Sequence, residues 1–169
     1  MRVTKLTETS CIVRWWTREH GIVETVAKGA RRSGSPFAGK IDLFFSADLT
    51  WQRAKRGSLH HLRESSVRHY REGLRQRYVN ALLAGYFTAM IEKITEIEHP
   101  EPEIYDLLVR ALDHVAAEGA NMRAMRHFER ELARLHGVGR QQGEAILELA
   151  DLGAGLPGMR KELMDRLHA

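Results

Sequence analysis

Positively charged loop residues are the feature of this sequence with the clearest chemical potential. The stretch VAKGARRSGSPFAG, residues 26–39, holds three cations within five positions, Lys28, Arg31 and Arg32, and no acidic residue. Glycines separate the cations, and the β-branched run GIVETVA precedes them. Because each cation can neutralise one phosphate, such a loop suits a polyanion. The alternative is a solvated turn that binds nothing.

The charge of the chain is divided unevenly along its length. Residues 1–63 carry 12 Lys and Arg against 5 Asp and Glu, whereas residues 64–169 carry 14 against 17. A basic N-terminal part indicates an anionic partner, and nucleic acid is the commonest partner of this kind. An acidic protein or a lipid surface would match the charge alone equally well.

The elements that must position these cations are predicted to be five short strands. Segments with β-branched, aromatic or alternating residues lie at 3–6, 10–17, 21–29, 39–53 and 57–64. Turns that contain glycine separate them, and no helical pattern of ten residues intervenes, so βαβ units are not expected. Because closure removes exposed strand edges, we predict a small antiparallel barrel. A small barrel with basic loops suggests an oligonucleotide-binding (OB) fold in residues 1–66.

The rest of the chain, residues 67–169, is predicted to be an α-helical domain. Apolar residues recur at helical spacing between residues 74 and 97, and Pro100 and Pro102 end that pattern. Two further amphipathic helices are expected at 103–119 and 121–137, the second with Asn121 as its N-cap. Two short helices complete the chain. The predicted fold class is therefore α+β.

Within an OB fold, cations follow the phosphates and aromatic rings stack on bases. The predicted DNA-binding cations are Arg14, Arg18, Lys28, Arg31, Arg32, Lys40, Arg53, Lys55 and Arg56. The rings available for stacking are Trp15, Trp16, Phe37, Phe44 and Trp51. Because Trp15 and Trp16 are adjacent on a strand, they face opposite sides, so one is expected in the core. The other is expected to be exposed or covered by the helical part.

The stretch LARLHGVGRQQGEAIL, residues 132–147, suggests a second phosphate contact. A helix, a Gly-hydrophobic-Gly turn and another helix resemble a helix-hairpin-helix motif, whose backbone N–H groups bind phosphate. His136 stands where that motif usually has proline, and Gly143 where alanine is usual. A simple helix C-cap at Gly137 followed by a tail is the favoured interpretation.

Metal, cofactor and catalytic sites find little support. The single cysteine, Cys11, excludes a zinc site built from several thiolates, and His60 and His61 face opposite sides of a strand. No phosphate-binding glycine motif follows a strand. We therefore predict a protein that is not an enzyme and needs no metal or cofactor. No apolar run reaches membrane-spanning length, which predicts a soluble cytoplasmic protein without a membrane partner.

Several stretches together resemble the bacterial RecO family of recombination mediators. They are ETS at 8–10, WWTREHGIVETVAKGARRSGSPFAG at 15–39 and GSLHHLRESSV at 57–67. The family run of Thr-Arg-Glu-x-Gly, a strand and Lys-Gly-Ala-Arg-Arg is complete here, from Thr17 to Arg32. The helical stretches YVNALLAGYFTAMIEKI, PEIYDLLVRALDHV and FERELARLHGVG also resemble the family. The four zinc-ligand cysteines of many members are absent.

The resemblance implies a DNA-repair mediator with an N-terminal OB domain that binds single- and double-stranded DNA. It also implies annealing of complementary strands, contact with RecR and with single-stranded-DNA-binding protein, and assistance in loading RecA. The binding is expected to be independent of base sequence, because phosphates carry no sequence information. The alternative function is a protein-interaction adaptor whose helical bundle and basic loops dock acidic peptide tails.

Overall fold

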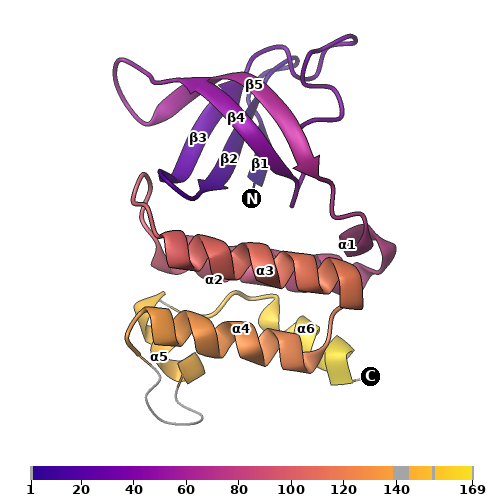
Figure 1. The fold of residues 1–169 in the computed structure, drawn as a ribbon, viewed down its shortest axis with the longest axis vertical. Coiled ribbons are helices and arrows are strands. Elements are labelled where there is room, and N and C mark those ends of the chain that lie inside the picture. Colours follow the sequence, from indigo (N-terminus) through magenta and orange to yellow (C-terminus); the bar gives the residue numbers. More distant parts are fainter. Residues whose placement is uncertain (1, 139–144, 154, 169) are drawn as a thin grey trace. The chain divides into compact units, whose positions relative to one another are not determined.

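The computed structural model describes residues 2–138, 145–153 and 155–168, which form two compact units. The first unit contains the residues up to Tyr70 together with Ile97–Pro100. The second contains Arg71–Glu96 and the residues from Glu101 onward. Strands build the first unit and helices the second (Figure 1), which confirms the predicted α+β class. Among the described residues, no helix has the length and apolar character needed to cross a membrane.

Five strands form one sheet in the first unit. They are β1 (Arg2–Lys5), β2 (Cys11–Thr17), β3 (Gly21–Ala27), β4 (Ser46–Gln52) and β5 (Leu59–His69). The strand order is β1-β2-β3-β5-β4. All neighbours are antiparallel except β3 and β5, which run parallel. The sequence predicted an entirely antiparallel sheet. After β3, however, the long segment 28–45 leads to β4 at the edge of the sheet, and β5 then returns between β3 and β4. Because β5 is antiparallel to β4, it runs parallel to β3.

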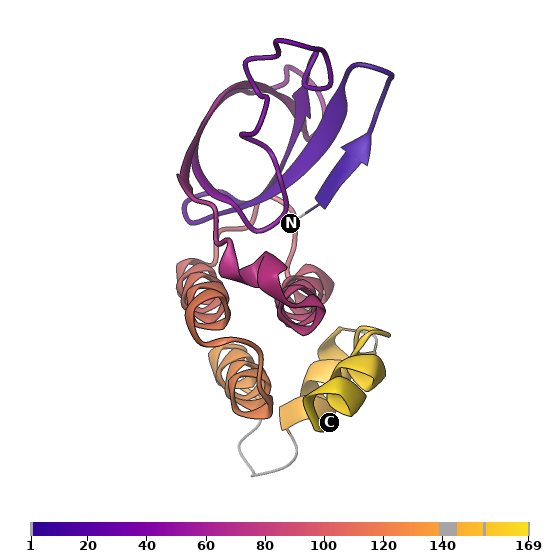
Figure 2. The ribbon, with the colours of Figure 1, turned by 90° about the vertical axis from the view of Figure 1, so that its right-hand side faces the viewer.

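The sheet is curled, as Figure 2 shows, but it is not closed into the predicted barrel. Among the described strands, no pairing joins β1 to β4. One physical reason is that β1 has only four residues, all exposed, and contributes little apolar surface. A second is that Phe37 and Ile41 of the segment 28–45 pack on the core formed by Cys11, Val13, Trp15, Ala27 and Leu62. A loop therefore covers part of the core that a closing strand pair would cover.

The fourth strand begins later than its alternating sequence predicted. Residues 39–45 were expected to extend, yet β4 begins at Ser46. The Asp42 side chain accepts a hydrogen bond from the Leu43 N–H at 2.7 Å, and Phe44 has a φ of 66°, which is incompatible with a strand. A local side-chain hydrogen bond and one left-handed residue thus interrupt the pattern.

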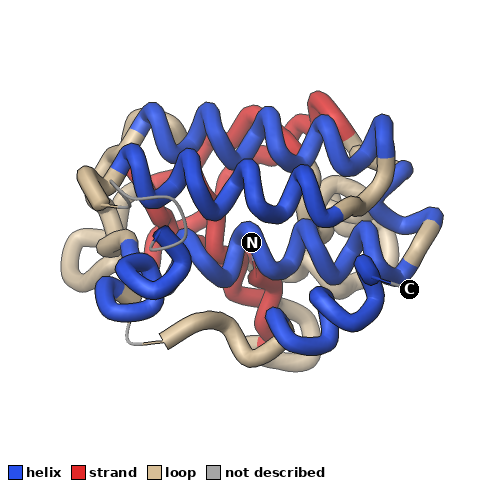
Figure 3. Tube along the Cα trace, turned by 90° about the horizontal axis from the view of Figure 1, so that it is seen from below, coloured by secondary structure: helices blue, strands red, loops and turns tan. Residues whose placement is uncertain are grey.

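The second unit contains six helices among its described residues. They are α1 (Gly73–Gln76), α2 (Tyr78–Ile94), α3 (Pro102–Glu118), α4 (Met122–Leu135), α5 (Ala145–Leu152) and α6 (Arg160–His168). The three long helices α2, α3 and α4 lie side by side (Figure 3), each packed on the next. The predicted N-cap of α4 is confirmed, because the Asn121 side chain accepts a hydrogen bond from the Ala124 N–H at 2.9 Å.

The core of the helical unit is apolar, with one buried polar network. Phe87 of α2 stacks on Phe128 of α4, with ring centroids 4.1 Å apart. Beside them, the Tyr86 hydroxyl donates to Glu129 at 2.6 Å, and Arg160 Nε donates to the same carboxylate oxygen at 3.0 Å. Because Glu129 is buried, these two donors compensate the loss of water around its charge.

Candidate nucleic-acid interface

The basic loop after β3 turns sharply at Gly29. Gly29 has a φ of 68°, and the Arg32 N–H donates to its carbonyl at 3.0 Å. An added Cβ at this position would meet only the flexible Arg32 side chain, at 3.6 Å. The left-handed backbone conformation, rather than lack of space, is therefore the reason for glycine here.

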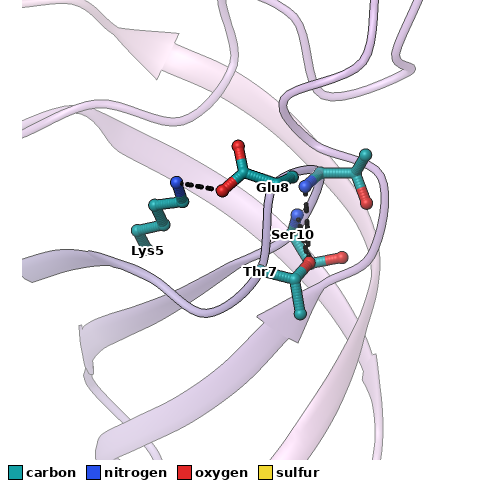
Figure 4. A network of polar contacts seen from close by, with 5 residues as sticks. Lys5, Thr7, Glu8 and Ser10 are labelled. Atoms are coloured by element: carbon teal, nitrogen blue, oxygen red, sulfur yellow. Dashed lines mark hydrogen bonds and ion pairs between the residues drawn. The ribbon is translucent and has the colours of Figure 1, made fainter.

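Backbone N–H groups of the basic loop bind the turn between β1 and β2, whose internal contacts Figure 4 shows. The Gly29 N–H donates to Ser10 Oγ at 3.2 Å, and the Arg31 N–H donates to the Thr9 carbonyl at 3.0 Å. The turn is held in its own shape by Thr7 Oγ1, which accepts hydrogen bonds from the Ser10 and Thr9 N–H groups. The backbone of residues 29 and 31 is therefore held against the preceding turn, and this fixes where the loop begins.

The three cations of this loop are exposed but do not gather at one place. Lys28 lines a groove beside β5, whereas Arg31 lines a smaller cavity of about 350 Å³ with Lys5 and Cys11. Phe37 borders both hollows. Arg32 is exposed and lies beside Gly29. The sequence showed a single cluster, but the turn at Gly29 separates Lys28 from Arg31.

The groove beside β5 brings five positively charged side chains together in the first unit. It has a volume of about 700 Å³, and its charged residues are Lys28, Arg53, Lys55, Arg56 and Arg63. Val26, Phe37, Leu59 and Leu62 are among the apolar residues that line it. Among the described residues, no carboxylate lines this groove. Cations over an apolar surface form an arrangement that suits a polyanion with apolar parts.

The strand pairing explains why these cations meet. The parallel register places Val26 of β3 opposite His61 of β5, so Lys28 leaves the sheet next to β5. The turn 53–58 between β4 and β5 supplies Arg53, Lys55 and Arg56 to the same groove. Sequence reasoning selected these four cations but could not show that distant segments bring them together.

Arg63 is a groove residue that the sequence analysis missed. It lies on β5, is exposed, and its guanidinium donates to the Gln52 side chain on β4. The signal was present in the alternation of β5, where His60 and Leu62 are buried while His61 and Arg63 are more exposed. Because a side chain alternates faces along a strand, His61 and Arg63 share the outer face.

The remaining predicted cations lie outside this groove. Arg14 is partly buried, and its guanidinium donates to one oxygen of Glu24 on the neighbouring strand, at 2.9 Å from Nε and 2.6 Å from Nη2. Arg18 is exposed in the turn between β2 and β3. Lys40 is exposed at the end of the basic segment, where its carbonyl accepts a hydrogen bond from the Ser65 hydroxyl. The ion pair with Glu24 makes the charge of Arg14 less available to a ligand.

Most of the predicted stacking rings are buried. Trp15, Trp16 and Phe37 are each exposed by 8% or less, so their faces are covered, and Trp15 Nε1 donates to Thr25 at 2.9 Å. Both tryptophans are therefore inside the protein. Phe44 and Trp51 are half-buried, and Trp51 has an edge contact with His20, with ring centroids 5.2 Å apart. Of the five rings, these two retain exposed surface.

The second phosphate hypothesis falls mainly on residues 139–144, which lie outside the described residues. What precedes them is a helix end. Gly137 has a φ of 72°, and the Val138 N–H donates to the Ala133 carbonyl at 2.9 Å. This geometry agrees with the C-cap at Gly137 that the sequence favoured.

Across the described parts of the chain, no three His, Cys, Asp or Glu side chains gather in a way that could hold a metal ion. Cys11 is buried, and this burial raises the pKa of its thiol, although the charge of Arg31 offsets part of the effect. A reactive thiolate is therefore not favoured at this position.

A curled five-stranded sheet with a basic groove and a separate helical unit define an α+β protein. The family model described as Recombination protein O N terminal matches residues 1–71. The model described as Recombination protein O C terminal matches residues 75–141. The chain belongs to the RecO family, as its sequence motifs predicted.

Relatives across bacteria carry the name DNA repair protein RecO. The chain is 32% identical to the one from Rhodopirellula baltica over 138 residues, which cover 81% of this chain and 51% of the relative. It is 30% identical to the one from Neisseria meningitidis, covering 78% and 48%, and 28% identical to the one from Bacillus pumilus, covering 68% and 44%. The chain thus spans about half the length of the curated relatives it matches.

Proposed function

We propose that this chain is a DNA-repair and recombination mediator whose β unit is an OB fold that binds single- and double-stranded DNA. The observation that carries the proposal is the groove lined by Lys28, Arg53, Lys55, Arg56 and Arg63, which has no Asp or Glu among its described lining residues. Five strands in a curled, incompletely closed sheet are consistent with the partly open barrel of OB folds. The family name of the relatives supports the repair role.

The mechanism is electrostatic. Lysine and arginine in the groove neutralise phosphates, and the counterions that leave the DNA favour binding. A second strand approaching the bound strand then meets less negative charge, which lowers the repulsion that slows annealing. Because phosphates are alike at every position, the groove binds without regard to base sequence. Bound in this way, the protein anneals complementary strands.

The partners follow from membership of the family. We propose that the chain acts with RecR, contacts single-stranded-DNA-binding protein, and assists the loading of RecA. These proteins and chromosomal DNA lie in the bacterial cytoplasm, which is where we place this chain. The mediator role requires no chemistry by the protein itself, so we assign it no catalytic residue, metal or cofactor.

The decisive experiment removes charge from the groove. Replacing Arg53, Lys55 and Arg56 together by alanine should flatten the dependence of log K on log salt by up to about 2 for a single-stranded oligonucleotide. A titration of fluorescence anisotropy at several salt concentrations measures this slope, with unrelated oligonucleotide sequences affected alike. Stability should change little, because exposed loop cations contribute little to folding.

The matched control removes the same charge elsewhere. Arg126, Arg130 and Lys161 are exposed on helices of the second unit, and their joint replacement by alanine should leave the slope near that of the parent. Circular dichroism establishes first that both triple variants are folded. If the groove variant binds DNA as the parent does at low and moderate salt, the groove is not the DNA site.

The adaptor function remains a second candidate because of a hollow between α3 and α4. This hollow has a volume of about 730 Å³, and Arg110, His114, Arg123 and His127 line it beside apolar residues and Glu118. A groove of this composition suits an acidic peptide with apolar side chains. Binding of an acidic peptide that replacement of Arg110 and Arg123 by alanine abolishes, in a chain without measurable DNA affinity, would favour the adaptor.

A further inference from the structure

The segment Ile97–Pro100 connects two helices of the second unit but belongs by its contacts to the β unit. The Glu98 N–H donates to the Ile22 carbonyl at 3.0 Å, and Ile97 forms a parallel bridge with Ile22. At Gly21 a side chain would overlap the His99 carbonyl, so only glycine permits this close approach. The segment is therefore fixed against the beginning of β3.

Glu98 is held in an unfavourable backbone conformation. Its φ of 58° lies in the left-handed region, which a residue other than glycine, asparagine or aspartate adopts rarely. Such a conformation persists only where surrounding contacts impose it, and it is common at functional positions. At Glu98, both the backbone N–H and the carboxylate have partners in the β unit.

The two oxygens of the Glu98 carboxylate contact two different cationic or donor groups. His60 Nε2 lies 2.9 Å from Oε1, and Arg53 Nη2 lies 3.6 Å from Oε2. The other nitrogen of His60, Nδ1, accepts a hydrogen bond from the Ala54 N–H at 3.3 Å. Neutral His60 consequently carries its proton on Nε2 and donates it to Glu98. Oε1 of Glu98 is thus held by the buried His60 ring, and this leaves Oε2 facing Arg53.

Arg53 and Ala54 belong to the wall of the basic groove, so this carboxylate lies at its border. The His60 side chain is only 3% exposed, whereas the Arg53 side chain is 72% exposed. A long and exposed ion pair is weak and is screened by salt, so Arg53 can exchange partners easily. The buried contact with His60, by contrast, keeps Glu98 in place when Arg53 leaves.

We propose that Glu98 is a built-in competitor that lowers the affinity of the groove for polyanions. Its carboxylate forms an ion pair with Arg53, and a phosphate that binds Arg53 must displace that contact. This inference rests on the proposed function of the groove. It assigns Glu98 the role of an affinity-setting residue that limits how tightly the protein holds DNA, with the largest effect at low salt.

The test uses Glu98→Gln in the full chain, which removes the charge but keeps an oxygen that can accept from His60. We expect it to bind a single-stranded oligonucleotide about two- to fivefold more tightly at low salt, the range that exposed ion pairs produce. In a chain that also carries Arg53→Ala, the gain should vanish. Glu19→Gln, which removes an exposed carboxylate from the turn between β2 and β3, serves as the control for net charge.

A second readout is the dependence of the effect on salt. The gain in affinity of Glu98→Gln should shrink as the salt concentration rises, because salt screens the exposed ion pair that the substitution removes. A gain in Glu98→Gln that persists without Arg53, or that Glu19→Gln reproduces, would overturn the inference. So would an unchanged affinity at low salt.

The failure of this inference and of the proposed function can be told apart. If Glu98→Gln binds like the parent while the groove variant loses affinity, the groove binds DNA but Glu98 does not regulate it. If the groove variant also binds like the parent, the proposed site itself is wrong.

Discussion

The same residue type serves different purposes in this protein according to its neighbours. Arg14 is partly buried and bound to Glu24 by two short hydrogen bonds, so its charge holds two strands together. Arg53 is mostly exposed, and its long ion pair with Glu98 leaves its charge accessible to a ligand. Counting basic residues in the sequence treats the two alike. Burial and the distance to the nearest carboxylate distinguish a structural cation from a binding cation.

Two glycines in helices, Gly73 and Gly85, allow a test of how closely their helices pack on neighbouring segments. A Cβ at Gly73 would overlap the Ala116 carbonyl oxygen, a backbone atom that cannot turn away, whereas a Cβ at Gly85 would lie 3.8 Å from the Met159 sulfur. We expect Gly73→Ala to lower the free energy of unfolding by about 2–4 kcal/mol, because the helices must separate. Urea denaturation measures the change.

Gly85→Ala is the matched control for that substitution. Because Gly85 lies within α2 and has room for a methyl group, alanine should raise the free energy of unfolding by about 0.5–1 kcal/mol. Equal effects of the two substitutions would mean that the approach of α1 to α3 is looser than the structure indicates.

At the scale of elements, the buried network of Tyr86, Glu129 and Arg160 connects α2, α4 and α6. Tyr86→Phe removes one donor from a buried carboxylate and should cost about 1–3 kcal/mol of unfolding free energy. Tyr78→Phe is the control, because that ring is 60% exposed, and it should change stability by less than about 0.5 kcal/mol. Thermal or urea unfolding compares them.

The same network predicts a dependence of stability on alkaline pH. Burial raises the pKa of the Tyr86 hydroxyl, and the charge of Glu129 and its hydrogen bond raise it further. The unfolded chain loses this proton near pH 10, whereas the folded chain keeps it. The folded state then binds more protons, so stability is complete below about pH 10 and falls as the pH rises above it.

In Tyr86→Phe that part of the alkaline decline should be absent. Urea denaturation of the parent and the variant at about pH 9 and pH 11 shows the difference as a shallower loss of unfolding free energy in the variant. Identical declines would indicate that Tyr86 is accessible to solvent in the folded protein, contrary to its burial.

The elements that the sequence predicted best are those with local determinants. The long helices follow from apolar residues at helical spacing, and Asn121 identified the start of α4 correctly. The beginning of β4 was missed because alternation from Ile41 to Phe45 resembles a strand, while the hydrogen bond of Asp42 and the left-handed Phe44 decide otherwise. Local competition between hydrogen bonds is not visible in a pattern of apolar residues.

The candidate site could be predicted as a set of charges but not as a shape. Lys28, Arg53, Lys55 and Arg56 were each chosen from the sequence, yet their grouping depends on the parallel pairing of β3 with β5. That pairing is long-range and leaves no local signal. The same pairing adds Arg63, which no loop pattern indicated, while the turn at Gly29 separates Arg31 from Lys28.

At the scale of the whole molecule, the β unit is not one continuous stretch of the chain. The β unit takes its last segment, Ile97–Pro100, from between two helices of the other unit. The chain therefore passes between the units at residues 70–71, 96–97 and 100–101. A β unit produced without residues 97–100 lacks the backbone partner of Ile22 and the carboxylate partner of the buried His60.

This topology predicts that a fragment ending at Tyr70 is less stable than the β unit with its complete set of contacts. The missing hydrogen bond and the unpaired nitrogen of His60 should each lower the free energy of unfolding by about 1–3 kcal/mol. A fusion that attaches residues 96–101 to the fragment through a long flexible linker should recover much of this stability, because linker length adds only slowly to the entropy of closure. The same fusion with Glu98→Ala should not recover the part that His60 contributes. Chemical denaturation followed by tryptophan fluorescence compares the three proteins, since Trp15 belongs to the core of this unit. Equal stability of the fragment and the fusion would show that the segment 97–100 is dispensable for the β unit.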